Sequence, residues 1–252
     1  MNLDKYLQRI HIKRPEPPSG DFLAELMHRH LMSIPFENLD IGRNVRISMD
    51  TMHLYEKIVT DGRGGFCFEL NSLFACLLKA LNFSVTLASA RVFNAGENKY
   101  GPEFDHLILL VNLDECYLVD VGFGDSFRKP LPLPHGRQKN ACDTYKITTL
   151  PSPATYLVQR QAERGWQPLF RFAGTPRKLS DFKAMCKYHQ TSPDSHFTQK
   201  RICTIATPEG RKTLTDSDLI ITAGQKKTKS PVSSSKIFHQ MLNDHFQIQL
   251  SH

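Results

Sequence analysis

Hydrophobic residues in the first third of the chain recur at intervals of three and four, which is the spacing of one face of an α-helix. This periodicity predicts four helices, which start near residues 3, 20, 50 and 67. Ser19 or Asp21 can cap the second helix and Asp50 the third, and Pro35 ends the second. We therefore expect residues 1–82 to form a helical bundle.

From Ser84 onward the pattern changes to alternating β-branched and polar residues, which is typical of strands. It predicts six strands, over residues 85–93, 106–111, 115–121, 144–150, 156–161 and 166–172. Prolines and polar residues make residues 129–143 a predicted loop. We expect a mostly antiparallel sheet or barrel here.

The last part of the chain mixes the two patterns. Strands are predicted over residues 201–207, 213–215 and 219–221, followed by a basic loop over residues 224–231. An amphipathic helix that uses Ile237, Phe238, Met241, Leu242 and Phe246 closes the chain. Together the three parts predict an α+β protein.

The composition is that of a globular protein, with 40% hydrophobic and 23% charged residues. The sequence has no apolar run of membrane-spanning length, and its first residues lack the order of a signal peptide, so we expect a cytoplasmic protein. The six cysteines form no C-x-x-C pair, and the histidines do not cluster at zinc spacing. We therefore expect reduced thiols and no metal.

The formal net charge of +7 suits an anionic partner. The basic residues form no run longer than the Lys-Lys-Thr-Lys stretch that starts at residue 226, and no nucleic-acid-binding motif is present. A phosphorylated small molecule is therefore favoured over nucleic acid or a membrane surface.

The candidate nucleophile is Cys67, which follows a glycine-rich turn and opens the fourth predicted helix. Unpaired amides and the helix dipole at this position favour thiolate over thiol, and the thiolate is the reactive form. Glycines at 62, 64 and 65 allow a sharp turn and close approach of a substrate. The alternative is a buried structural cysteine, because cysteine is among the most buried residue types.

His106 and Asp120 are candidate partners for this thiol, because each lies at the edge of a strongly apolar strand. If residues 112–114 form the hairpin loop between the two strands, His106 faces Asp120 directly. A carboxylate could then orient the imidazole. The alternative is a histidine and an aspartate at strand ends in solvent.

The chain resembles the arylamine N-acetyltransferases. Arg63 to Asn71 matches the family signature R-G-G-x-C-x-E-L-N at every specified position, and His106 matches the strand histidine of the family. Three further segments are similar to family motifs: Ile34–Leu39 to I-P-F-E-N-L, Val119–Gly124 to V-D-V-G-F-G, and Thr191–Phe197 to S-T-x-P-x-S-x-F. No motif aligns in the C-terminal fifth.

The resemblance implies an α+β fold with a cysteine-protease- or transglutaminase-like core. Residues 1–82 would form the helical bundle that carries the catalytic cysteine, residues 83–190 the antiparallel β-barrel that carries His and Asp, and residues 191–252 an α/β lid. It also implies a Cys67, His106 and Asp120 triad. Family members transfer acetyl from acetyl-coenzyme A to an aromatic amine or hydrazine through a cysteine thioester.

The resemblance also implies roles around the triad. Phe36, Phe123 and Phe197 match positions that line the acceptor pocket, although any single phenylalanine is more often plain core. Gly124 matches a position where coenzyme A approaches the backbone. From the residues themselves, we predict that Arg63 pairs with Glu37 and that the pair supports the loop beneath Cys67.

Two other functions use the same residues or the same pocket. A thiol hydrolase or a transglutaminase-like acyl transferase could pass an acyl group to water or to a lysine with the same triad. A non-catalytic binding protein could keep the pocket. In that case a triad residue would be expected to be missing, and all three are present in this sequence.

Overall fold

The computed structural model describes residues 1–139, 143–151 and 155–250. Its N-terminal part contains α1 (Leu3–Arg9), α2 (Gly20–Ser33), a short α3 (Leu39–Gly42), α4 (Thr51–Tyr55) and α5 (Cys67–Ala80). A single π-helical turn, Glu56–Thr60, continues α4. Ser19 and Asp50 cap α2 and α4 through their side chains, so both predicted caps are confirmed, with Ser19 rather than Asp21 at the second helix.

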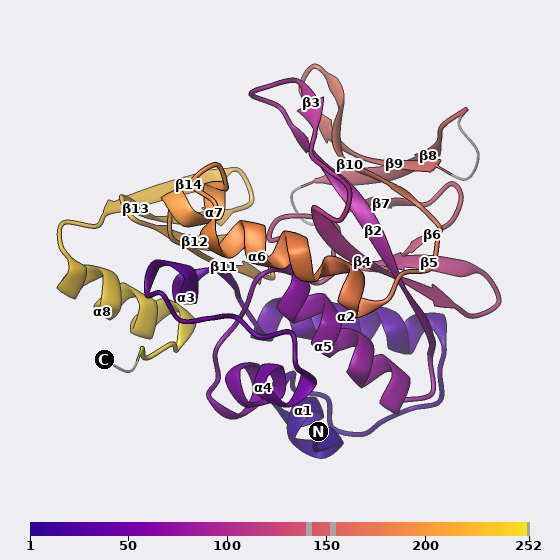
Figure 1. Ribbon diagram of the computed structural model, residues 1–252, viewed down its shortest axis with the longest axis horizontal. Coiled ribbons are helices and arrows are strands. Elements are labelled where there is room, and N and C mark those ends of the chain that lie inside the picture. Colours follow the sequence, from indigo (N-terminus) through magenta and orange to yellow (C-terminus); the bar gives the residue numbers. More distant parts are fainter. Residues whose placement is uncertain (140–142, 152–154, 251–252) are drawn as a thin grey trace.

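Helix α5 is the central element of the fold. It packs against β2 (Ser84–Asn94) and β4 (His106–Asn112) on one side and against α1 and α4 on the other (Figure 1). Eleven of its fourteen residues are buried, from Cys67 to Leu78. A helix that is apolar nearly all round belongs in the interior, and this one places Cys67 at the junction between the helices and the sheet.

The first sheet is antiparallel and has nine strands. Besides β2 and β4 it contains β3 (Lys99–Tyr100), β5 (Cys116–Val119), β6 (Leu131–Pro132), β7 (Arg137–Lys139), β8 (Thr144–Thr149), β9 (Thr155–Ala162) and β10 (Gly165–Ala173). Their order is β6-β5-β4-β2-β10-β9-β8-β7, with β3 beside β2. The end strands β6 and β7 contact each other, which makes the sheet nearly a closed barrel.

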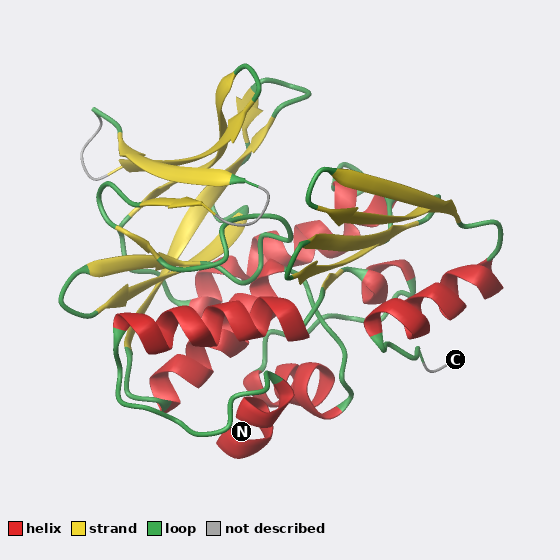
Figure 2. Cartoon of the chain, turned by 180° about the vertical axis from the view of Figure 1, so that it is seen from behind, coloured by secondary structure: helices red, strands yellow, loops and turns green. Residues whose placement is uncertain are grey.

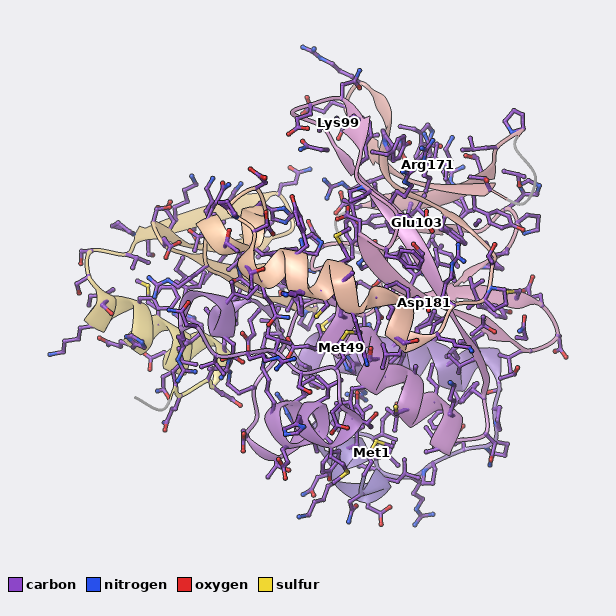
Figure 3. All side chains as sticks on the ribbon, viewed as in Figure 1. Met1, Met49, Lys99, Glu103, Arg171 and Asp181 are labelled. Atoms are coloured by element: carbon purple, nitrogen blue, oxygen red, sulfur yellow. The ribbon has the colours of Figure 1, made fainter. Side chains whose placement is uncertain are left out.

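The six strands predicted for this part are confirmed, although β5 ends two residues earlier than expected. The predicted loop over residues 129–143 is partly wrong, because it contains the short strands β6 and β7; its residues 140–142 lie outside the described part. The side chains of Lys99 and Arg171 mark the end of the sheet that is remote from Met1 and the helices (Figure 3).

A second antiparallel sheet has the order β1-β11-β12-β13-β14. Its strands are β1 (Phe36–Glu37), β11 (Ile202–Thr207), β12 (Gly210–Thr215), β13 (Asp218–Ala223) and β14 (Lys226–Pro231), and α8 (Ser235–Phe246) packs on β11 and β12. Figure 2 shows the two groups of strands, in yellow, with the helices beneath and between them.

The loop predicted over residues 224–231 is wrong for residues 226–231, which form the edge strand β14. Every residue of β14 is exposed, so neither face of the strand needs apolar side chains. The strand therefore has no period-two pattern, and lysines at an exposed edge are a common protection against pairing with other chains.

The connection between the sheets contains a 3₁₀ turn (Leu179–Phe182), α6 (Lys183–Thr191) and α7 (His196–Gln199). The elements cross the expected division of the chain. Strand β1, from the helical part, pairs with β11, and α6 lies across the boundary expected at residue 190. The division into residues 1–82, 83–190 and 191–252 stays a prediction.

Candidate active site

Cys67 is the first residue of α5, and the preceding turn fits closely against its surroundings. A Cβ on Gly64 would lie 2.0 Å from the carbonyl oxygen of Pro35, and one on Gly65 would lie 2.8 Å from the Glu69 side chain. Only glycine fits at these two positions. Glu69 Oε2 accepts a hydrogen bond of 3.0 Å from the N–H of Phe66. The start of α5 is therefore held both by the close fit of the glycine turn and by this hydrogen bond.

His106 and Asp120 form a buried pair in which His106 Nε2 lies 2.7 Å from Asp120 Oδ2. The hairpin register predicted for them is wrong by two residues, because Asn112 faces Cys116 and Leu109 faces Val119. The loop is therefore residues 113–115. A slip of two residues keeps every side chain on its expected face, which explains why the predicted pair forms nonetheless.

The second oxygen of Asp120 is held by two donors. Oδ1 accepts from Asn71 Nδ2 at 2.9 Å and from the N–H of Gly122 at 2.8 Å. Asn71 in turn accepts from the N–H of Val121, which ties the segment after β5 to the first turns of α5. A Cβ on Gly122 would lie 2.8 Å from Cys67 Cα, so the aspartate segment reaches the cysteine backbone.

Asn71 has a role that the sequence alone did not indicate. It belongs to the signature segment, and its completely buried side chain also donates to the carbonyl of Leu107 at 2.7 Å. A polar residue in the middle of an apolar helix was the available signal, since such a group requires partners when it is buried.

The ionisation of Cys67 runs against the expectation from its place at a helix start. Burial raises the pKa of the Cys67 thiol well above its usual value, and the carboxylates of Asp105 and Asp120 raise it further. A hydrogen bond from the backbone of Leu107 lowers the same pKa without offsetting the rise. The resting side chain is therefore a thiol, and a nearby base must remove its proton before it can act as a nucleophile.

Beneath the cysteine turn lies a network of charged side chains, in which Glu37, Asp40, Arg63 and Glu69 are buried and Lys57 is partly buried. Arg63 Nη2 is 2.8 Å from Glu37 Oε1 and 2.9 Å from Asp40 Oδ1, so the predicted pairing of Arg63 with Glu37 is confirmed. Lys57 Nζ lies 2.8 Å from both Asp40 Oδ2 and Glu69 Oε1. The network is larger than the predicted pair, and through Glu69 it reaches the amide that precedes Cys67.

Replacing Arg63 with alanine should destabilise the protein by about 3–5 kcal/mol, because the buried Glu37 would lose its closest cation and Asp40 would lose one of its cationic partners. Urea unfolding at pH 7 measures this loss. Arg29→Ala is the control, since the Arg29 pair with Glu25 is about half exposed and should contribute less than about 1 kcal/mol. Equal stability of the two variants would contradict a supporting role for the network.

The network also predicts a dependence of stability on pH. Three cations, Lys57, Arg63 and the partly exposed Arg43, pair with three carboxylates, yet burial raises the pKa of Glu69 from 4.5 to about 7. The folded state thus holds this proton more tightly than the unfolded chain does. Its contribution to stability is fully present below about pH 4.5 and is lost as the pH rises through about 7.

Glu69→Gln keeps an acceptor for the Phe66 amide but cannot ionise. From pH 5 to pH 8 the wild type should lose on the order of 1–3 kcal/mol of unfolding free energy relative to this variant. Glu25→Gln, at an exposed glutamate, should show no such difference. Parallel stability curves for the wild type and Glu69→Gln would refute the assignment.

The three predicted pocket phenylalanines lie around the cysteine and the histidine. The rings of Phe36 and Phe197 have centroids 6.1 Å apart, and Phe197 is edge-on to Phe66, the residue before Cys67. Phe123 is edge-on to the His106 ring at 5.3 Å. Phe170 contacts both His106 and Phe123 and was not indicated by the sequence, because it lies on a different strand, β10.

Gly124 has φ +88°, a conformation that other residues rarely adopt. An added Cβ would make only ordinary contacts, 3.6 Å from the Phe36 ring at the closest. The backbone angle, rather than a lack of space, is the reason for glycine here. The next residue, Asp125, is paired with Arg160 and Arg211.

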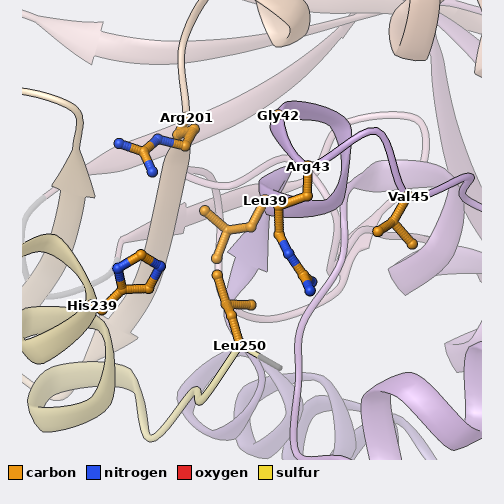
Figure 4. A pocket seen from close by; sticks show the side chains of 7 residues that line it. All are labelled: Leu39, Gly42, Arg43, Val45, Arg201, His239 and Leu250. Atoms are coloured by element: carbon orange, nitrogen blue, oxygen red, sulfur yellow. The ribbon is translucent and has the colours of Figure 1, made fainter. Parts of the chain in front are cut away.

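Two hollows of the structure lie away from these residues. One, of about 520 Å³, has Leu39 and Leu250 at its centre, with Arg201 and His239 on one side and Arg43 and Val45 on the other (Figure 4). A groove of about 1380 Å³ runs between the segment 41–53 and α6. Cys67 and His106 are each 3% exposed.

Within residues 1–139, 143–151 and 155–250, no three or more His, Cys, Asp or Glu side chains are grouped so that they could hold a metal ion. In the same part of the chain, no helix is long and apolar enough to cross a membrane. The five cysteines in this part, at 67, 76, 116, 186 and 203, are free thiols.

Comparison with known proteins places the chain in a family. A family model described as N-acetyltransferase matches residues 21–252. The pineal gland isozyme NAT-10 of arylamine N-acetyltransferase from Gallus gallus is 33% identical over 236 residues, which cover 85% of this chain and 81% of the relative. The range matched by the family model contains every residue of the predicted site.

Solved structures agree with the sequence comparison. A variant of the arylamine N-acetyltransferase from Mycobacterium smegmatis superposes with a TM-score of 0.91 at 29% identity, over 99% of this chain and 93% of that chain. The enzyme from Mycobacterium marinum in complex with CoA superposes with a TM-score of 0.89 at 28% identity, over 98% and 93%. The α+β fold implied by the resemblance is thereby confirmed, and the chain belongs to the arylamine N-acetyltransferase family.

Proposed function

We propose that this protein transfers an acetyl group from acetyl-coenzyme A to the nitrogen of an arylamine, arylhydrazine or hydrazide through a thioester on Cys67. The observation that carries the proposal is the buried His106–Asp120 pair, joined by Asn71 and Gly122 to the first turn of the helix that Cys67 begins. Family membership and the CoA complex of the Mycobacterium marinum relative support it. A cytoplasmic location is part of the same proposal.

In the first half of the reaction, His106 takes the proton of Cys67. Its Nε2 faces Asp120, so Nε2–H donates to the carboxylate and Nδ1 is the nitrogen left to accept a proton. The thiolate attacks the acetyl carbonyl carbon, the carbon–sulfur bond to coenzyme A breaks, and the leaving thiolate takes the proton from His106. The buried Asp120 stabilises the imidazolium between these steps.

The oxyanion of the tetrahedral intermediate needs hydrogen-bond donors near the sulfur. The N–H of Phe66 is bonded to Glu69, and the carbonyl of Phe66 accepts from Glu69 and Leu70. The first amides of a helix have no partner within it. The N–H groups of Cys67 and Phe68 are therefore the proposed donors, and the buried charge network keeps their turn in place.

In the second half, the acceptor nitrogen attacks the thioester. An arylamine is a weak base and is neutral near pH 7, so its lone pair is free. His106 takes the proton from the attacking nitrogen, the bond to Cys67 breaks, and the proton returns to the sulfur. Phe36, Phe123 and Phe197 are proposed to hold the aromatic ring of the acceptor, and Gly124 to contact coenzyme A.

A thiol hydrolase or a transglutaminase-like acyl transferase would use the same triad with another acceptor. The test is the release of free coenzyme A thiol from acetyl-coenzyme A with a panel of arylamines and hydrazines, with a lysine peptide, and with buffer alone. Release should be catalytic only with aromatic amines or hydrazines. Equal release in buffer would indicate a hydrolase, and a preference for the peptide would indicate a transglutaminase-like enzyme.

A further inference from the structure

A second histidine–aspartate pair lies beside the candidate site and has no role in the proposed reaction. His189, in α6, is 4% exposed. Its Nε2 lies 3.1 Å from Asp105 Oδ1, and its Nδ1 lies 3.1 Å from Ser195 Oγ. One buried imidazole thus connects the residue immediately before β4 with the residue immediately before α7.

The Asp105 end of this bridge belongs to the catalytic strand. Asp105 directly precedes His106, and its other oxygen, Oδ2, accepts a hydrogen bond of 3.3 Å from the N–H of Val92. The carboxylate is also close enough to Cys67 to raise the pKa of its thiol. The bridge therefore starts directly beside the base and close to the thiol.

The Ser195 end of the bridge lies next to the aromatic rings around the cysteine turn. Ser195 caps α7 by accepting from the N–H of Phe197. The Phe197 ring is edge-on to the His189 ring, with centroids 5.1 Å apart, and it also packs on Phe66 and Phe36. A shift of Ser195 would therefore move the phenylalanine that lies next to the cysteine turn.

The hydrogen bonds of His189 occupy both of its ring nitrogens. A carboxylate can only accept, so Nε2–H donates to Asp105, while Nδ1 and the carbonyl oxygen of His189 are both within hydrogen-bond distance of the Ser195 hydroxyl, at 3.1 and 3.4 Å. Both ring nitrogens thus have protein partners, and Ser195 is 2% exposed. Ser195 Oγ also accepts from the N–H of Phe197 as the cap of α7, so the geometry favours a structural link between two walls of one site.

We propose that His189 is a positioning residue for the acceptor half of the reaction, because its link from Asp105 to Ser195 holds Phe197 in place for an aromatic amine. The inference rests on the proposed function. The binding of aromatic acceptors then depends on His189 in α6. The acetylation of Cys67 needs only the triad and the donor, and is independent of the link.

The test compares one aromatic and one ring-free acceptor. For His189→Ala, KM for an arylamine should rise about tenfold, as expected when hydrogen bonds to a charged group are lost. The single-turnover rate of Cys67 acetylation and the turnover of hydrazine, which has no ring to position, should stay within about twofold of wild type. Ser195→Ala should show the same pattern.

Two conservative variants separate the two ends of the bridge and remain informative if His189→Ala unfolds. The amide of His189→Gln can reach Asp105, and the amide of His189→Asn can take the place of Nδ1 and bond Ser195. If Ser195 is the end that positions Phe197, His189→Asn should restore the arylamine KM and His189→Gln should not. Lys187→Gln, at an exposed site of the same helix, is the control and should behave as wild type.

Two results would overturn the inference. An unchanged arylamine KM in His189→Ala and Ser195→Ala would show that the bridge does not position the acceptor. Equal losses in acetylation, hydrazine turnover and arylamine turnover would show that His189 maintains the whole site. A wild-type protein that acetylates no amine would overturn the proposed function as well, so the two failures can be distinguished.

Discussion

Replacing Cys67 with alanine is expected to abolish the acetylation of arylamines. Among the described cysteines, only Cys67 is the first residue of a helix, and the segment that follows Asp120 reaches its backbone at Gly122. Without the sulfur no thioester forms, and the two half-reactions lose their shared intermediate. The turnover of an arylamine with acetyl-coenzyme A, measured with a folded variant, checks this result.

The matched control is Cys76→Ala, which removes a thiol from the same helix. Cys76 is partly buried, and its sulfur lies 3.8 Å from Thr51 Oγ1, far along α5 from the cysteine turn. This variant should keep nearly full turnover. Substantial turnover by Cys67→Ala, or a comparable loss in both variants, would remove Cys67 from the role of nucleophile.

Asp120→Asn is expected to lower kcat by about 10⁴-fold, the loss measured when the orienting carboxylate of a serine-protease triad is replaced by its amide. The reason follows from the hydrogen bonds of this site. The Oδ1 position receives donors from Asn71 and from Gly122, so the oxygen of an asparagine must take that place. Its NH₂ group then points at His106 Nε2.

His106 Nε2 would then have to accept, so the ring proton would move to Nδ1, the nitrogen that should take the proton of Cys67. The variant would thus have nearly native packing and the wrong tautomer. Asp125→Asn, at a half-exposed carboxylate five residues away, is the control and should keep most of the activity. Activity of Asp120→Asn within tenfold of wild type would contradict the orienting role.

Elements with a buried face could be predicted from the sequence, and elements without one could not. Helix α5 and the long strands β2, β4, β9 and β10 each carry enough apolar residues to show their period. The exposed edge strand β14 has no apolar side, and the two residues of β1 form a strand only because β11 lies beside them. Pairing of distant segments leaves no local pattern.

The site follows the same rule. The turn before Cys67 consists of adjacent residues, so the sequence was sufficient to locate it. Asp40 and Lys57 join Arg63 only through tertiary packing, which local sequence does not show. The burial that raises the pKa of the Cys67 thiol could not be predicted from the sequence, because the helix-start argument is local whereas burial depends on the whole fold.

The acetyl thioester on Cys67 is tested most directly by the intact mass of the wild-type protein after mixing with acetyl-coenzyme A alone, followed by peptide mapping. One added acetyl group is expected, located on Cys67, and it should be lost when an arylamine is then added. Acetyl on any other cysteine, or on Cys67 but not transferred to the amine, would contradict this expectation.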